Sequence, residues 1–447
     1  MRLIEYVASE IRTSRSFLRG AVGLAGGAAA AQLITVLFSP ILTRLYSPRE
    51  LGVLAAYSAL IATLVIVGSL RYELVVTLAK DQSEARNALA LSLTLAILTA
   101  LISGFALTLF GGRLNSDLWG MGGYGGLFAL SLAGAAIYQA FVYWALRTEK
   151  YARVAVSIGS QSLATSIGQC SFGLAGFGTF GLLLGDAAGR LVGGGLLAYL
   201  SRRQDGRILA SATLGAIRRV AIHFRRFPSI ATPAALLNGV GLNAPTLLIA
   251  GLFGPLHAGL FALSRRVIGL PMNVIGHSVS QAYVGRATRL LREDAARLPE
   301  FFTKSAAALL VLGVLPIGAV SIGGPWLFSV VFGGEWAEGG TYIRVLGPAY
   351  LGQFVVAPVS QTLNLIERQG RQFIWDASRL AIVLGSLIGG KAYGLTAIQS
   401  VAVYSAATVF AYIWLFVWSR NALQAVRDVP RLPQETTGSA APNTVAL

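Results

Sequence analysis

Long apolar runs separated by short charged connections dominate this chain. A hydrocarbon core about 30 Å thick needs roughly 20 apolar residues in a helix, so each run of that length predicts a membrane-spanning helix. Twelve such runs cover residues 20–44, 51–79, 86–111, 122–146, 154–175, 178–200, 228–252, 257–284, 303–331, 341–366, 373–393 and 395–418. The pattern predicts an all-α integral membrane protein with about 12 transmembrane helices.

Positively charged residues fall mainly on alternate connections. Of the 36 Lys and Arg residues, 26 lie at the termini and on one set of connections, and 6 lie inside predicted spans. The other set carries only Arg44, Arg49, Arg113 and Lys391. Because Lys and Arg are retained on the cytoplasmic side of a membrane, both termini are predicted to be cytoplasmic. The net charge of +17 therefore reflects membrane topology, and no nucleic-acid partner is expected.

A short motif occurs once in each half of the chain. Tyr46-Ser47-Pro48 with Gly52 recurs 207 residues later as Phe253-Gly254-Pro255 with Gly259. Both copies follow the first span of six, which predicts two parallel repeats with a central cavity between them. The predicted organisation is an N-terminal six-helix lobe (1–200), a basic cytoplasmic linker (201–227), a C-terminal six-helix lobe (228–418) and a disordered cytoplasmic tail (419–447).

Charged residues inside the predicted spans are the first functional candidates, because a charge in hydrocarbon is costly and usually faces a cavity or a partner. The candidates at depth are Arg71, Arg190, Arg265, Arg266, Glu73 and Asp186. Arginine stays charged and forms paired hydrogen bonds with phosphate, so this excess of arginine favours an anionic ligand. The alternative is that these arginines pair with backbone or lipid phosphate. Adjacent helical residues point about 100° apart, so Arg265 and Arg266 are not expected to face one cavity squarely.

Asp186 and Arg190 stand four residues apart and so share one helix face. The pair has two interpretations, a structural ion pair or a mechanistic one in which Asp186 binds a coupling proton or Arg190 binds the ligand. Glu73 belongs to the same group of ion-coupling or structural candidates. Uncharged polar residues in the second half, above all Asn238 and Gln281, are predicted to line a hydrated cavity for sugar hydroxyls.

Small and cyclic residues predict how the helices pack. Gly185, Gly189 and Gly193 repeat every four residues, which is typical of close helix–helix contact. Before residue 228 the only prolines are Pro40 and Pro48, whereas the second half is rich in them. Proline removes a helical hydrogen bond, so bending is expected mainly in the second half.

Several function classes lack their residues. Cys170 is the only cysteine and the three histidines are scattered, so no metal site is predicted. The sequence has no glycine-rich loop ending in Lys-Ser or Lys-Thr, so no nucleotide cofactor is expected either. We predict that the chain is not an enzyme.

Ordered blocks of residues carry a family resemblance. The blocks are Ser39 to Pro48 with Gly52; Leu70-Arg71-Tyr72-Glu73; Phe227-Pro228 with Pro233 and Asn238; Phe253 to Pro255 with Gly259, Arg266-Val267, Pro271 and Ile275-Gly276; and Phe332 to Trp336 with Pro358, Glu367-Arg368-Gln369 and Trp375. Over nearly the whole chain this order resembles bacterial polysaccharide-biosynthesis flippases of the multidrug/oligosaccharidyl-lipid/polysaccharide (MOP) exporter superfamily.

That resemblance implies a specific function. Such proteins move undecaprenyl-pyrophosphate-linked O-antigen or exopolysaccharide units across the bacterial inner membrane, through a cavity that opens alternately to each face. The implied partners are the lipid-linked oligosaccharide, membrane lipids and other polysaccharide-assembly membrane proteins. Alternatives are a drug or small-solute exporter of the same superfamily, a membrane polysaccharide polymerase or glycosyltransferase, and a structural scaffold.

Overall fold

Helices account for all the regular structure of the described chain. The computed structural model describes residues 2–111, 121–206, 213–269, 277–366 and 368–427, and no strand occurs among them. Eight helices of these ranges are long and apolar enough to cross a membrane. The remaining predicted spans form α6, α10 with α11, α14 and α16, which pack against these eight. The prediction of an all-α integral membrane protein is confirmed.

Two groups of helices make up the bundle. The first group contains α1 (Arg2–Leu45), α2 (Pro48–Gly68), α3 (Glu73–Leu78), α4 (Gln82–Phe110), α5 (Gly125–Arg147), α6 (Tyr151–Leu174) and α7 (Gly178–Asp205). The short α8 (Leu214–His223) packs against α4, and a π-helical turn (Phe227–Ala231) leads into the second group.

The second group contains α9 (Thr232–Phe253), α10 (Pro255–Ile268), α11 (His277–Glu293), α12 (Leu298–Ile322), α13 (Gly324–Val331), α14 (Ala337–Ser360), α15 (Thr362–Leu365), α16 (Gln369–Ala392) and α17 (Ala397–Arg427). Single 3₁₀ turns precede α12 and α14. Prolines lie inside α9, α12 and α14, which places most helix-interior prolines of the described chain in the second group, as predicted.

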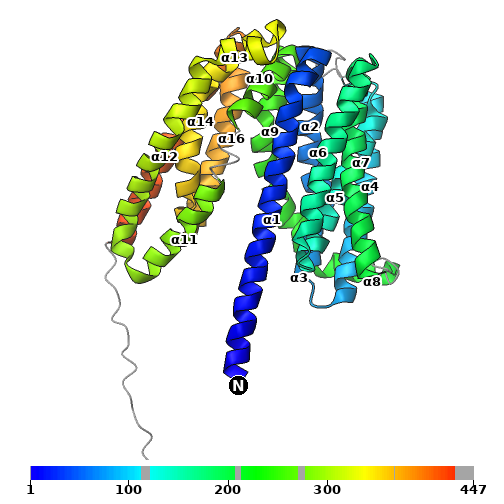
Figure 1. The fold of residues 1–447 in the computed structure, drawn as a ribbon, viewed down its shortest axis with the longest axis vertical. Coiled ribbons are helices and arrows are strands. Elements are labelled where there is room, and N and C mark those ends of the chain that lie inside the picture. The colour runs from blue at the N-terminus through cyan, green and yellow to red at the C-terminus, as the bar shows by residue number, and fades with distance from the viewer. Residues whose placement is uncertain (1, 112–120, 207–212, 270–276, 367, 428–447) are drawn as a thin grey trace, which may run out of the picture.

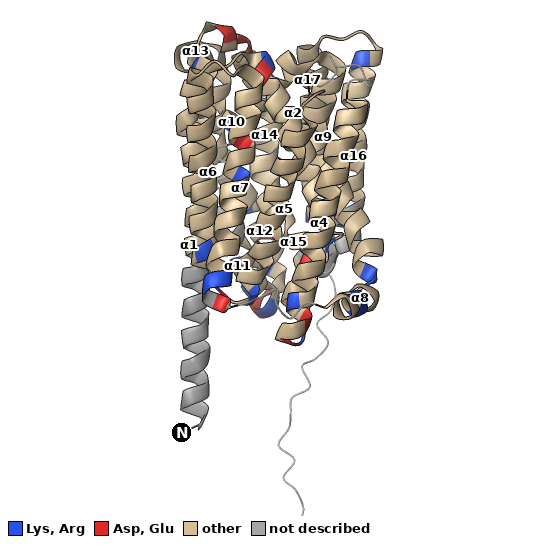
Figure 2. Cartoon of the chain, turned by 90° about the vertical axis from the view of Figure 1, so that its right-hand side faces the viewer, with Lys and Arg blue, Asp and Glu red and all other residues tan. Residues whose placement is uncertain are grey.

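The two groups meet at one end of the molecule and separate toward the other (Figure 1). We call these the α13 end and the α8 end after the short helices that they carry. Charged residues gather mainly at the two ends, and few lie in the middle of the bundle (Figure 2). The arginine-rich helices α8 and α11 both lie at the α8 end.

Helix starts follow the local sequence. Ser47 caps α2 in a capping box, since its side chain accepts from the Glu50 backbone N–H while Glu50 accepts from the Ser47 N–H. Pro48 occupies the first turn, where no backbone donor is needed. Asp81 caps α4 by accepting from the Glu84 N–H at 2.7 Å.

Four predicted spans are interrupted, and treating them as continuous helices was wrong. The span 51–79 breaks after Gly68, where Leu70 and Arg71 adopt positive φ angles of 49° and 63°. The span 257–284 comprises α10 and α11, and residues 270–276 lie outside the described chain. In the span 303–331, α12 ends before Gly323 and α13 follows it. The span 341–366 divides into α14 and α15.

The repeated motif lies where the two groups cross. A Cβ atom on Gly52 of α2 would stand 1.7 Å from the Pro255 carbonyl oxygen, and one on Gly259 of α10 would stand 1.9 Å from the Pro48 carbonyl oxygen. Each glycine thus receives the backbone of the other copy, and only glycine permits this approach. Nearby, the buried Trp336 indole donates to the Thr43 carbonyl at 3.0 Å, which also joins the two groups.

An ion pair and a glycine ridge fix α7 within the first group. Asp205 accepts two hydrogen bonds from Arg153, at 2.7 and 3.0 Å, and one from the Trp144 indole. The Arg153 hydrogen bonds hold the pKa of Asp205 below its usual range. The predicted packing glycines, Gly185, Gly189 and Gly193, each face α6 so closely that a Cβ would stand 2.6 Å or less from an α6 atom. Their packing role is confirmed.

Candidate functional site

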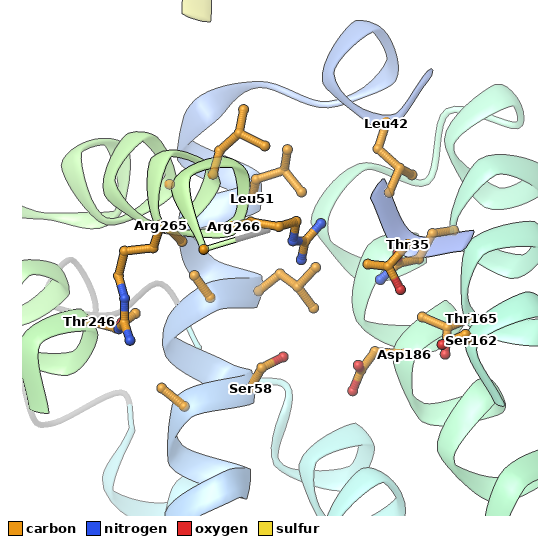
Figure 3. A pocket seen from close by; sticks show the side chains of 18 of the residues that line it. Thr35, Leu42, Leu51, Ser58, Ser162, Thr165, Asp186, Thr246, Arg265 and Arg266 are labelled. Atoms are coloured by element: carbon orange, nitrogen blue, oxygen red, sulfur yellow. The ribbon is translucent and has the colours of Figure 1, made fainter. Parts of the chain in front are cut away.

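A polar cavity lies between the two groups of helices. Its volume is about 640 Å³, and residues of α1, α2, α6 and α7 from the first group and α9, α10 and α14 from the second line it (Figure 3). Four predicted site residues meet here, although they are far apart in sequence: Asp186, Arg190, Arg265 and Arg266. Leu51 and Gly259 also line the cavity, so the glycine crossing lies directly beside it.

Asp186 and Arg190 form the ion pair that their spacing predicts. The Arg190 Nε donates to the Asp186 Oδ2 at 2.7 Å. The Ser131 hydroxyl donates to the same oxygen at 3.3 Å, and the Tyr57 hydroxyl donates to Ser131 at 2.7 Å. The Asp186 carboxylate is therefore held by Ser131 of α5 and Arg190 of α7, and Tyr57 of α2 holds Ser131 in place. Opposite charges with this hydrogen bonding satisfy each other without a ligand, yet both residues also face the cavity.

Arg265 and Arg266 both line the cavity but point apart, as their adjacent positions on α10 predict (Figure 3). Arg265 points toward the second group, where it donates to Thr246 at 3.0 Å and Tyr350 at 3.1 Å. Its guanidinium also lies 5.6 Å from the centre of the Phe261 ring. These neutral partners position the guanidinium without neutralising it.

Arg266 points toward α1 of the first group, where it donates to the Ser39 hydroxyl at 3.3 Å. Neither Arg266 nor Arg265 forms an ion pair with any carboxylate of the described residues. The three arginines and one aspartate that line the cavity give it a net positive charge of two. Such a cavity favours an anionic group, for which Arg offers paired hydrogen bonds.

One wall of the cavity was missed from the sequence. Gln161, Ser162, Thr165, Ser166 and Gln169 of α6 all face it. Their spacing places them on one helix face, so a polar period within span 154–175 was an available signal. The candidates predicted from the sequence at depth were mainly charged residues, and this wall carries none.

Arg71 and Glu73 lie away from the cavity, near the break between α2 and α3. They pair with each other at 3.3 Å, and the buried Glu73 carboxylate also accepts from the Ser69 hydroxyl. Arg71 takes a left-handed backbone conformation, which is uncommon for a residue other than glycine. The prediction that Arg71 joins the other arginines at depth in one cavity was wrong. The chain turns after Gly68, and Arg71 does not line the cavity.

The two predicted sugar-binding residues do not line the cavity. Asn238 of α9 is exposed and lies outside the lining. The backbone of Gln281 belongs to α11, but its side chain lies outside the described residues. Two other polar residues of the second half, Asn243 and Gln353, do line the cavity. No cluster of three potential metal ligands occurs among the described residues.

Comparison with known proteins places this geometry in context. The family profile described as Polysaccharide biosynthesis protein matches residues 41–339, and no curated protein sequence matches the chain. The chain is similar in structure to an inward-facing MATE multidrug resistance transporter of the MOP superfamily (TM-score 0.66, 14% identity, 89% of this chain and 95% of the other). It is similarly close to the lipid II flippase MurJ in its inward closed conformation (TM-score 0.67, 11% identity, 90% of each chain).

A third similar structure is a MOP superfamily transporter from Pyrococcus furiosus, whose reversed binding-pocket polarity is described as suggesting a different function. Its TM-score is 0.56 at 13% identity, with 93% of this chain and 96% of the other covered. At these identities the likeness concerns the fold. The predicted MOP-type membrane transporter fold is confirmed.

Proposed function

Because this chain belongs to the polysaccharide biosynthesis protein family, we propose that it is a flippase for undecaprenyl-pyrophosphate-linked oligosaccharide repeat units. It carries them from the cytoplasmic to the periplasmic leaflet of the bacterial inner membrane by alternating access, without chemical change to the substrate. The two termini and the α8 end face the cytoplasm. The arginines of α8 and α11 at that end support this orientation.

The net positive cavity between the two groups carries the proposal. A pyrophosphate needs cationic donors that remain charged away from bulk water, and Arg265 and Arg266 offer them without an acidic partner among the described residues. Neutral donors and acceptors on α6, α9 and α14 complete a polar lining suited to a saccharide. An exporter of cationic drugs requires the opposite charge, so the cavity supports the flippase over that alternative.

Alternating access requires the contact between the two groups at one end of the molecule to open while the groups close at the other end. In this structure the groups touch at the α13 end, through the glycine crossing and the Trp336 to Thr43 hydrogen bond. Arg266 joins the same junction through Ser39. We infer that a pyrophosphate competes with Ser39 for Arg266 and so couples substrate binding to the junction between the groups.

Transport in proteoliposomes tests the function. The purified full chain is reconstituted, and movement of a fluorescent undecaprenyl-pyrophosphate oligosaccharide between leaflets is followed under imposed ion gradients. Arg266→Ala should slow movement by about 10- to 100-fold, the worth of a charge-assisted hydrogen bond, while Arg266→Lys restores part of it. Arg344→Ala is the control, because this exposed arginine lies outside the cavity and donates only to the Ile322 carbonyl among the described residues.

Two results would contradict the proposal at different levels. Full activity of Arg266→Ala removes this residue from the substrate site but leaves the function standing. If the folded wild-type protein moves no lipid-linked oligosaccharide under any gradient, the flippase function is wrong.

A further inference from the structure

Four residues of α6 form a polar surface with no assigned role: Gln161, Ser162, Thr165 and Ser166, which we call the α6 polar face. All four line the cavity. None of their side chains forms a hydrogen bond with another described residue. Ser166 is the most enclosed, with 3% of its surface exposed. The Thr165 Oγ1 and the Gln161 Oε1 lie against Gly189 and Gly193 of α7, which have no side chain to pair with them, and all four residues line the cavity.

Many hydroxyl groups elsewhere in the bundle are paired within their own helix, although the buried hydroxyls of Ser201, Ser321, Ser400 and Ser419 have no partner among the described residues. Most serines and threonines in an apolar helix donate to a carbonyl one turn earlier, because an unpaired hydroxyl is costly away from water. Thr35, Ser39, Ser92, Thr108 and Ser264 all do so, at distances between 2.6 and 3.0 Å. The three hydroxyls of the α6 polar face, on Ser162, Thr165 and Ser166, make no such bond and lie on one helix surface that lines the cavity. Its groups are therefore available to a ligand.

The α6 polar face and the α10 arginines lie on different walls of the cavity. Ser162 and Thr165 stand across the cavity from Arg265 (Figure 3). The Arg266 side chain extends from α10 into the space that separates Arg265 from these two residues. The glycine ridge of α7 holds α6 close, so the Asp186 side chain lies on the same side as the α6 polar face. The cavity thus has a cationic wall on α10 and an uncharged hydrogen-bonding wall on α6.

Resting on the proposed function, we propose that the α6 polar face binds the saccharide part of the lipid-linked substrate and determines which oligosaccharides are carried. Sugar hydroxyls donate and accept hydrogen bonds, as do the serine and threonine hydroxyls and the Gln161 amide. A site built to pair such groups discriminates strongly against a ligand that lacks them, because its own groups then stay unpaired. The α10 arginines hold the pyrophosphate that all substrates share.

The test compares two ligands that differ only in the sugar. Undecaprenyl pyrophosphate and the undecaprenyl-pyrophosphate oligosaccharides extracted from the bacterium that encodes this chain are titrated against the full chain in nanodiscs. The triple variant Ser162→Ala, Thr165→Val, Ser166→Ala removes three hydroxyls with little change in shape. We expect it to bind the oligosaccharide form about tenfold more weakly and undecaprenyl pyrophosphate unchanged.

Control variants separate the inference from folding and from the function itself. Ser160→Ala with Ser171→Ala removes two hydroxyls from α6 outside the cavity and should leave both affinities unchanged. Arg266→Ala should weaken both ligands alike. The three single substitutions are measured as well, so a triple variant that fails to fold does not remove the answer.

Three outcomes overturn the inference. If the α6 variants lower the affinity for both ligands equally, or for neither, the α6 polar face does not recognise sugar. If the wild-type protein binds both ligands with equal affinity, the saccharide makes no specific contact and the inference fails while the flippase function stands. If the folded wild-type protein binds neither ligand, the proposed function fails together with the inference.

Discussion

The reciprocal glycine crossing predicts that a single methyl group opens the α13 end. Gly52→Ala would place a Cβ 1.7 Å from the Pro255 carbonyl oxygen, whereas Cβ atoms rarely come within 3.0 Å of another atom. The backbones of α2 and α10 must therefore separate by more than about 1 Å. Overpacking of this kind costs about 1–3 kcal/mol, which corresponds to a shift of roughly 5- to 150-fold against the conformation described here.

The two glycines should not act independently. Gly259→Ala meets the Pro48 carbonyl oxygen at 1.9 Å, so it forces the same two backbones apart. Once the first substitution has separated the helices, the second meets little further resistance. The double variant should therefore cost clearly less than the sum of the two single variants.

Distances between spin labels measure this shift. With Cys170 replaced by alanine, labels at Leu174 of α6 and Leu256 of α10 report on the two groups, and both positions are exposed. Gly52→Ala should enrich the longer distances in the distribution and reduce transport. Gly195→Ala is the matched control, because a Cβ there meets no atom within 4 Å. If Gly52→Ala leaves both the distances and the transport rate at wild-type values, the crossing does not hold the α13 end closed.

Three further predictions concern other parts of the chain. If the pair of Asp186 and Arg190 is structural, either Asp186→Asn or Arg190→Gln should lower expression by leaving a lone buried charge, costing about 3–5 kcal/mol, and the double variant should restore expression and transport. Restored expression without transport would instead give the pair a mechanistic role. Asp205→Asn should lower the thermal unfolding temperature at pH 7. The folded-state pKa of Asp205 is lowered, so its carboxylate stabilises the protein at any pH above the unfolded-state pKa of about 3.9. This stabilisation is lost as the pH falls through the folded-state pKa. The unfolding temperatures of wild type and variant should therefore converge as the pH falls below about 4. For topology, an impermeant thiol reagent added to intact cells should label cysteine at Tyr393 and spare it at Leu214, both highly exposed; the reverse pattern contradicts the proposed orientation.

Local features of the sequence were sufficient for the spans and the ion pair. Burial of apolar residues in hydrocarbon requires about 20 residues per helix, so length and composition alone locate most spans. Asp186 and Arg190 meet because helical geometry fixes residues four apart on one face, whatever surrounds them. The glycine spacing in α7 likewise predicted close packing, since a missing side chain permits approach in any fold.

Length, composition and helical period did not predict where a helix breaks or how it is rotated in the bundle. Arg71 was assigned to a continuous span because its neighbours are apolar, but the backbone turns after Gly68 and the side chain pairs with Glu73 instead. Asn238 was assigned to the cavity for its polarity alone, and the rotation of α9 leaves it exposed on another face. The composition of a segment does not determine which face of its helix is turned toward the cavity.

The sequence by itself determined a membrane protein of helices with arginine at depth and a repeated motif, because hydrophobic length, charge placement and helical period act within one segment. Only the tertiary structure decided that Gly52 and Gly259 accept each other's backbone, that Arg265 and Arg266 face the cavity without an acidic partner among the described residues, and that the α6 polar face lies on another wall. These relations depend on how α2, α6 and α10 pack against one another. Packing of the two groups joins residues up to 293 positions apart, as in the hydrogen bond from Trp336 to Thr43, and no local pattern records it.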